Sequence, residues 1–144
     1  MALETMEVRR EVAIDAARLW DVISGVGGVD RWFTGVILTC RVEGSGVGAK
    51  RFCTMAGGVK LNEQIVEIDH GRMSFGYTIE DNSALPAQKI LGTMQLRPLG
   101  QGRTEFVWKA EYEPREGMPG AMRTMLEEVY PTGIQSLVSY CQAG

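Results

Sequence analysis

Histidine and cysteine are scarce in this sequence, and it contains no long run of apolar residues. The 144 residues include one histidine and three cysteines, which are Cys40, Cys53 and Cys141. The cysteines do not have the spacing of zinc ligands, and one histidine cannot complete the usual zinc sites. We therefore expect no metal and no cofactor, and we expect the cysteines to act as small apolar side chains.

The sequence also lacks an excess of charge of one sign. The net charge is −3, and there is no basic run of the kind that marks a nucleic-acid partner. No apolar stretch approaches the roughly 20 residues of a membrane-spanning helix, so we expect no membrane insertion. The first residues contain acids where a secretory signal has lysines, and this difference favours the cytoplasm.

The residues that are present have the composition of an ordinary globular protein. Hydrophobic residues make up 44% of the chain and charged residues 23%. A chain of this length can bury about two thirds of the surface that its unfolded form exposes. We expect one domain that spans residues 1–144.

Alternation of apolar and polar residues predicts a series of antiparallel strands. It is clearest in residues 104–113, where Phe106, Trp108, Ala110 and Tyr112 share one face. One face of the sheet should therefore be dry and the other wet. The predicted strands are residues 6–14, 34–42, 49–56, 60–69, 72–80, 88–98 and 104–113.

Helices are predicted after the first strand and after the last strand. Asp15 can cap a helix over residues 16–24, and a short helical turn ends near Trp32 and Phe33. The longest helix should cover residues 121–140, where the apolar residues recur at spacings of three and four. These residues are Met122, Leu126, Val129, Gly133, Leu137 and Tyr140.

Strands that follow one another between segregated helices indicate the α+β class rather than βαβ units. The dry surface of seven strands is larger than a single short layer can cover. We therefore expect a strongly curved, seven-stranded antiparallel sheet wrapped around the long C-terminal helix. Two short helices should lie between the first and second strands.

Several short stretches resemble one protein family. They are residues 12–16 (Val-Ala-Ile-Asp-Ala), 31–36 (Arg-Trp-Phe-Thr-Gly-Val), 48–51 (Gly-Ala-Lys-Arg) and 102–108 (Gly-Arg-Thr-Glu-Phe-Val-Trp). In this order and spacing they resemble the polyketide cyclase/dehydrase and lipid-transport superfamily. The resemblance implies its helix-grip, or START-like, fold, which also occurs in birch-pollen allergens and plant abscisic-acid receptors. It does not imply one activity, because members include cyclases, hormone receptors and lipid carriers.

The resemblance also implies a cavity between the curved sheet and the last helix. Its lining would be apolar and rich in methionine and aromatic residues, as in small-molecule pockets, and Gly92 and Gly133 would leave space in it. Trp32, Phe33 and the loop around Leu85 would form its rim. The alternative is a solid core, because protein interiors are close-packed. The predicted ligand-binding residues are Trp32, Leu38, Cys53, Met55, Phe75, Leu85, Ile90, Met94, Phe106, Trp108, Met122, Met125, Leu126 and Val129.

Arg51 and Glu63 are the polar exceptions on otherwise apolar strand faces. A strict two-residue loop at Gly57-Gly58 would place them on opposite faces, whereas an odd loop or a bulge would place them on one face. The matching family motif has both side chains pointing inward, and we follow it. They would then either orient a ligand or form a structural ion pair, and a position facing solvent is a further alternative.

Three functions are compatible with this pattern. The first is binding of a small hydrophobic or aromatic molecule, polyketide- or lipid-like. The second is a polyketide cyclase or dehydratase, in which Glu63 is the acid/base and Arg51 and Tyr77 polarise a carbonyl. The third is an interaction domain without a ligand, and the sequence also leaves room for a homodimer. Leu38 and Ile90 stand where the abscisic-acid receptors have an inward Lys and Tyr, which argues against their mode of carboxylate capture.

Overall fold

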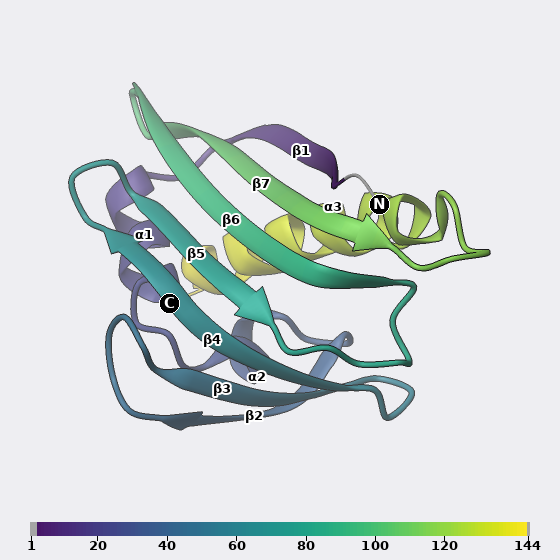
Figure 1. Cartoon of the computed structure of the whole chain (residues 1–144). Coiled ribbons are helices and arrows are strands. Elements are labelled where there is room, and N and C mark those ends of the chain that lie inside the picture. Colours follow the sequence, from purple (N-terminus) through teal and green to yellow (C-terminus); the bar gives the residue numbers. More distant parts are fainter. Residues whose placement is uncertain (1–2, 144) are drawn as a thin grey trace.

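Residues 3–143 of the computed structural model form one antiparallel sheet and three helices (Figure 1). The strands lie side by side in the order β1-β7-β6-β5-β4-β3-β2, so β1 and β2 are the edges. The elements follow one another as β1 (Glu4–Val12), α1 (Ala16–Ile23), α2 (Val29–Trp32), β2 (Ile37–Glu43), β3 (Lys50–Met55), β4 (Lys60–Asp69), β5 (Ser74–Ile79), β6 (Ala87–Gly100), β7 (Arg103–Pro114) and α3 (Ala121–Ala143). The α+β helix-grip prediction is confirmed.

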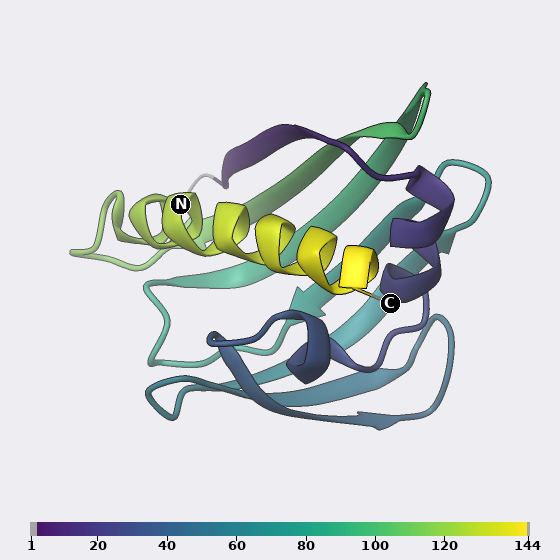
Figure 2. The same ribbon diagram turned by 180° about the vertical axis from the view of Figure 1, so that it is seen from behind.

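The long helix α3 crosses the concave face of the sheet, and the two short helices lie at its side (Figure 2). Leu126, Ile134 and Leu137 are buried on the side of α3 that faces the sheet. Arg18 of α1 donates a hydrogen bond from Nε to the carbonyl of Cys141 and so ties α1 to the end of α3. Tyr140, predicted on the buried face, is 41% exposed. Within the described residues, none of the helices has the length and apolar character of a membrane span.

Alternation in β7 and in β6 from Ile90 onward produces the dry face that was predicted. Phe106, Trp108, Ala110 and Tyr112 of β7 are all at most 3% exposed. Successive side chains of a strand point to opposite faces, so these four residues lie on the side that α3 covers. Ile90, Met94 and Leu96 of β6 are buried on the same face.

The prediction for Leu38 is wrong, because a β-bulge interrupts the alternation of β2. The register with β3 shifts between Ile37 and Thr39, which leaves Leu38 as an extra residue on the bulged strand. The shift turns Ile37 toward the core and leaves Leu38 57% exposed. Leu38 therefore cannot line a cavity.

The turn that connects β3 and β4 has an odd number of unpaired residues, and this decides the register of Arg51 and Glu63. Met55 donates its backbone N–H to the carbonyl of Val59, so the pairing begins one residue before β4 and leaves three residues, 56–58, in the turn. Among them, Gly57 and Gly58 have φ values of 95° and 91°, which glycine adopts without strain. Arg51 and Glu63 are thereby directly opposed across the two strands and share one face.

Gly92 and Gly133 do not leave empty space, contrary to the prediction. A Cβ atom on Gly92 would lie 2.3 Å from the ring of Tyr77, and one on Gly133 would lie 2.7 Å from Trp108. Aromatic side chains occupy the volume that each glycine vacates. The two glycines are thus needed for close packing of these rings against the backbone.

We predict that Gly92→Ala destabilises the protein by about 1–3 kcal/mol, because the added methyl group must displace the Tyr77 ring. Urea denaturation measures this change. Gly71→Ala is the matched control, since a Cβ there meets only the carboxylate of Asp69 at an ordinary 3.5 Å. Equal stability of the two variants would contradict the packing role of Gly92.

Candidate ligand site

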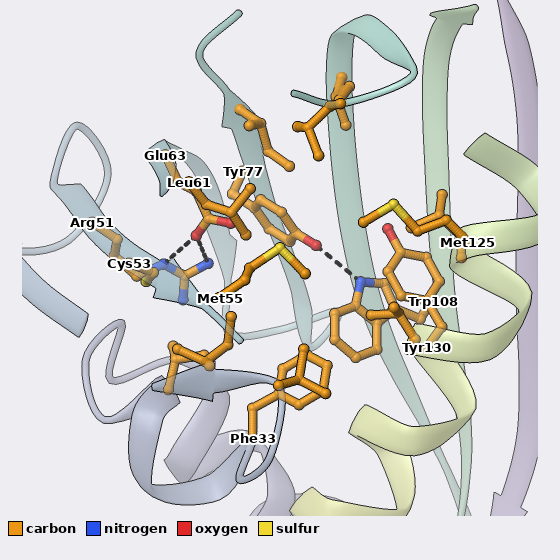
Figure 3. Close-up of a pocket in the computed structure, with 18 of the residues that line it drawn as sticks. Phe33, Arg51, Cys53, Met55, Leu61, Glu63, Tyr77, Trp108, Met125 and Tyr130 are labelled. Atoms are coloured by element: carbon orange, nitrogen blue, oxygen red, sulfur yellow. Dashed lines mark hydrogen bonds and ion pairs between the residues drawn. The ribbon is translucent and has the colours of Figure 1, made fainter. Parts of the chain in front are cut away.

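A cavity of about 70 Å³ lies between α3, α2 and the strands β2–β7 (Figure 3). Its lining combines apolar side chains from the helices with a polar group on β3 and β4. The lining residues are Val29, Trp32, Phe33, Val36, Ile37, Arg51, Cys53, Met55, Leu61, Glu63, Tyr77, Ile79, Leu85, Ile90, Met94, Trp108, Met122, Met125, Leu126, Val129 and Tyr130.

The structure places most of the predicted ligand-binding residues on this cavity. Those that line it are Trp32, Cys53, Met55, Leu85, Ile90, Met94, Trp108, Met122, Met125, Leu126 and Val129. Leu38 is on the outer surface. Phe75 and Phe106 face the dry side, but they are packed within the core and do not reach the cavity.

Tyr130 is the most important lining residue that the sequence reasoning missed. Its ring stacks on Trp108 with 4.2 Å between centroids and an angle of 10° between planes. Tyr130 could have been found from its position in the sequence. It is four residues after Leu126 and eight after Met122, and this spacing places all three on one face of α3. Val29, Ile37 and Ile79 were also missed.

The cavity is much smaller than a typical ligand pocket, which has about 300–1,000 Å³. Its own side chains account for the difference. Phe33, Trp108 and Tyr130 form a cluster of contacting rings at the α3 side, and Tyr77 lies over Gly92. In this conformation the site has room only for a few atoms beyond its lining.

The polar end of the cavity is an ion pair between Arg51 and Glu63 (Figure 3). Nε and Nη2 of Arg51 lie 2.8 Å and 2.7 Å from Oε1 of Glu63, and the two side chains are 5% and 9% exposed. Nη1 of Arg51 donates to the carbonyl of Val26 at 3.0 Å. Phe75 and Tyr77 present their ring faces to the guanidinium at 5.4 Å and 5.3 Å.

Val26 is held in a backbone conformation that a β-branched residue rarely adopts. Its φ is 68°, in the left-handed region, and it lies in the loop between α1 and α2. Such a conformation costs an L-residue about 1–2 kcal/mol. The hydrogen bond from Arg51 to its carbonyl helps to maintain this loop, which leads directly into α2.

Burial raises the pKa of the Glu63 carboxyl, and the neighbouring Arg51 opposes this by lowering it. The net direction is upward, because removal of the carboxylate from water outweighs the single charged partner. Glu63 is thus closer to the protonation range of an acid/base group than an exposed glutamate would be.

Tyr77 accepts a hydrogen bond from Nε1 of Trp108 at 3.1 Å, in the middle of the cavity wall. Burial raises the pKa of Tyr77 to about 12, so the hydroxyl keeps its proton at neutral pH and can donate it in a hydrogen bond. Burial likewise raises the pKa of Tyr130 well above its ordinary value. The cavity therefore offers neutral hydroxyl groups beside the ion pair.

The expected rim residues are buried walls, and two of them, Trp32 and Leu85, accept a hydrogen bond from a polar side chain of another segment. Trp32, Phe33 and Leu85 are at most 5% exposed. Arg115 donates from Nε to the carbonyl of Leu85 at 2.7 Å and from Nη2 to Asp81 at 2.6 Å. Ser136 of α3 donates to the carbonyl of Trp32.

The family model for polyketide cyclase/dehydrase and lipid transport matches residues 4–142. The chain belongs to this family. The match includes α3 and all seven strands, so it covers every element that lines the cavity. No curated protein sequence matches the chain.

Solved structures with the same fold have very different sequences. An uncharacterised protein from Bacillus thuringiensis has a TM-score of 0.84 at 15% identity, over 96% of this chain and 99% of its own. Norcoclaurine synthase from Thalictrum flavum, in complex with dopamine and hydroxybenzaldehyde, has 0.79 at 16% identity, over 96% and 85%. A major latex-like protein from Panax ginseng has 0.81 at 15% identity, over 96% and 97%. These likenesses establish the fold alone.

We predict that Arg51→Met costs about 3–5 kcal/mol of stability at neutral pH, because it leaves the Glu63 carboxylate buried without a partner. Arg51 lowers the pKa of Glu63, so its removal lets burial raise this pKa further. A raised pKa in the folded state gives stability at low pH that is lost as the pH rises through that pKa. The cost should therefore be smaller at about pH 4, where a buried Glu63 carboxyl with a raised pKa is protonated.

Urea denaturation at acidic and neutral pH measures this difference. The double variant Arg51→Met with Glu63→Gln removes the titrating group, so it should lose the pH dependence and recover most of the stability. Equal destabilisation by Arg51→Met at both pH values would show that the carboxylate of Glu63 is not the source of the cost.

Proposed function

We propose that this protein binds a small hydrophobic or aromatic, polyketide- or lipid-like molecule that carries a hydroxyl or carbonyl oxygen. The observation that supports this most is the position of the Arg51–Glu63 pair in the wall of an apolar cavity. A buried ion pair contributes little to stability compared with apolar side chains of the same volume. A role in orienting a ligand's oxygen atom would explain why this pair is present in an apolar cavity, whereas its contribution to folding would not.

The donors and acceptors at this end of the cavity favour a neutral ligand. Oε1 of Glu63 accepts both bonds from Arg51, and Oε2 accepts none among the described residues. That oxygen can accept a hydrogen bond from a ligand's hydroxyl, and the hydroxyl of Tyr77 can donate one to a ligand's oxygen. A ligand carboxylate would have to be buried beside the negative charge of Glu63, which is costly.

Binding requires the cavity to enlarge, and its methionines are suited to this change. Met55, Met94, Met122 and Met125 all contribute to the lining. Methionine has three rotatable bonds and an unbranched chain, so it adapts its shape more readily than the branched or aromatic residues. An apolar cavity of about 150 Å³ accepts one benzene ring, so a modest expansion would admit a single aromatic ring.

A protein of the same fold gives this ligand class some support. Norcoclaurine synthase from Thalictrum flavum has been solved with dopamine and hydroxybenzaldehyde. Both are single-ring aromatic molecules with hydroxyl groups. Phenol is therefore a suitable minimal probe for the site, with toluene as an isosteric apolar comparison and benzoate as a charged one.

We predict that phenol shifts the NMR signal of the Trp108 indole N–H, because it would compete for the hydroxyl of Tyr77. Trp20 donates to His70 away from the cavity, so its indole signal should not move. Phenol should bind about tenfold more tightly than benzoate, since the carboxylate brings a charge into a buried site. Toluene should bind more weakly than phenol, because it offers no polar atom.

A pair of matched variants locates the binding. Met125→Phe places a rigid ring in the cavity and should weaken phenol binding at least tenfold. Met118→Phe makes the same change on the loop before α3, where the residue is 47% exposed, and should leave binding unchanged. Equal binding by both folded variants, or no shift of the Trp108 signal with phenol, would refute a ligand site here.

The second candidate is a polyketide cyclase or dehydratase, and the raised pKa of Glu63 favours it. The carboxylate would take a proton from the carbon beside a carbonyl. The resulting enolate would attack a second carbonyl of the same molecule, and a new carbon–carbon bond would form. Tyr77 would donate a hydrogen bond to the oxygen that gains negative charge. That oxygen would then take the proton back from Glu63, and the resulting hydroxyl group would leave as water with a proton from the neighbouring carbon.

We predict for this candidate that Glu63→Gln slows cyclisation of a linear diketone such as heptane-2,6-dione by about a hundredfold or more. The ultraviolet absorbance of the cyclic enone measures the rate. Glu67→Gln is the control, because Glu67 is on the same strand but accepts its hydrogen bond from Ser74. Cyclisation that survives Glu63→Gln, with phenol binding intact, would overturn the acid/base role and leave the binding function standing.

A cytoplasmic location, a homodimer and a single domain over residues 1–144 stay predictions. None of the contacts described above depends on them.

A further inference from the structure

Cys40 and Cys53 lie directly opposite each other on the neighbouring strands β2 and β3. Sγ of Cys53 is 2.8 Å from Sγ of Cys40, and both cysteines are free. Opposed residues of antiparallel strands have Cα atoms about 4.5 or 5.5 Å apart. Both distances fall within the range of about 4.4–6.8 Å that disulfides require, so a bond could form without backbone movement.

The two sulfurs differ in their surroundings in a way that suits stepwise oxidation. Cys40 is half-buried on an edge strand, whereas Cys53 is buried and lines the cavity. Cys40 is thus the sulfur that a reagent meets first.

The hydrogen bond between the two sulfurs favours a thiolate at Cys40. The hydrogen bond from Cys53 lowers the pKa of Cys40, and Arg51 adds to this, whereas burial and the negative charges of Glu63 and Asp30 oppose it. The same hydrogen bond and burial raise the pKa of Cys53, so it keeps its proton. A thiolate beside a protonated thiol is the arrangement of an attacking sulfur and a resolving sulfur.

We propose that Cys40 and Cys53 form a peroxide-sensitive dithiol that oxidises to a disulfide between β2 and β3, in the wall of the cavity. The thiolate of Cys40 attacks one oxygen of hydrogen peroxide, the O–O bond breaks, and the departing hydroxide takes up a proton to become water. Cys40 is then a sulfenic acid. Cys53 attacks this sulfur, the S–S bond forms, and the hydroxyl group leaves with the thiol proton as a second water.

The balance of this reaction is simple. Two thiols and one hydrogen peroxide give one disulfide and two waters, so the dithiol is oxidised and the peroxide is reduced. Thioredoxin-type dithiols would restore the pair by exchange. The bond would fix edge strand β2 to β3 beside Arg51. Arg51 is two residues before Cys53 on β3 and points to the same face.

Mass spectrometry after thiol labelling tests the proposal on the full chain. The reduced protein is treated with a small excess of hydrogen peroxide, free thiols are alkylated, and the protein is digested with trypsin. The three cysteines fall in different tryptic peptides, which are residues 32–41, 52–60 and 124–144. The expected product links the first two peptides through a disulfide, while Cys141 remains fully alkylated.

Cys141 serves as the internal control. It is buried against α1, and burial raises its pKa, so it should be the least reactive of the three. Cys141→Ser should oxidise like the wild type, whereas Cys40→Ser should slow the loss of the Cys53 thiol at least tenfold. Cys53→Ser should leave Cys40 as a sulfenic acid, which dimedone traps.

Three results would overturn the proposal. One is a disulfide between two chains in place of the linked peptides. Another is oxidation of Cys40 beyond the sulfenic acid with Cys53 still free. The third is loss of the Cys141 thiol as fast as that of the pair. Phenol binding by the reduced protein does not depend on any of them, so the two proposals can fail separately.

Discussion

A curved sheet of seven strands presents more apolar surface than one helix can cover. The packing of the interior follows from this incomplete cover. α3 lies across the concave face, and glycines in the interior let aromatic rings approach the backbone. Tyr77 occupies the space over Gly92, and Phe33 and Trp108 occupy the space beside Gly133. The remaining gap is the small cavity, so the site exists because the cover is incomplete.

The lining of the cavity contains both rigid aromatic residues and flexible methionines. The rings of Trp108 and Tyr130 stack in parallel and form a firm wall on the side of α3. Methionines from β3, β6 and α3 contribute to the rest of the lining, and their side chains can be rearranged at low cost. The cavity can therefore be small when it is empty without being closed to a ligand permanently.

Much of the fold could be predicted from the sequence, because the period of two in β6 and β7 decides which face is buried. Arg51 and Glu63 were harder, since their faces depend on whether a glycine-containing loop has an even or an odd number of residues. Leu38 could not be placed, because a bulge changes the alternation without any signal in the apolar pattern. Gly92 was ambiguous in principle, since a missing side chain can leave a void or receive a neighbouring ring.

Arg51 touches two parts of the protein that are otherwise far apart in the chain. It binds Glu63 in the cavity wall, and it binds the carbonyl of Val26, whose backbone is held in the left-handed region. The loop that contains Val26 leads into α2, which carries Trp32 to the cavity. The Arg51 guanidinium thus connects the β4 side of the cavity with the loop before α2. A change in its contact with Glu63 would therefore also affect the loop that positions α2.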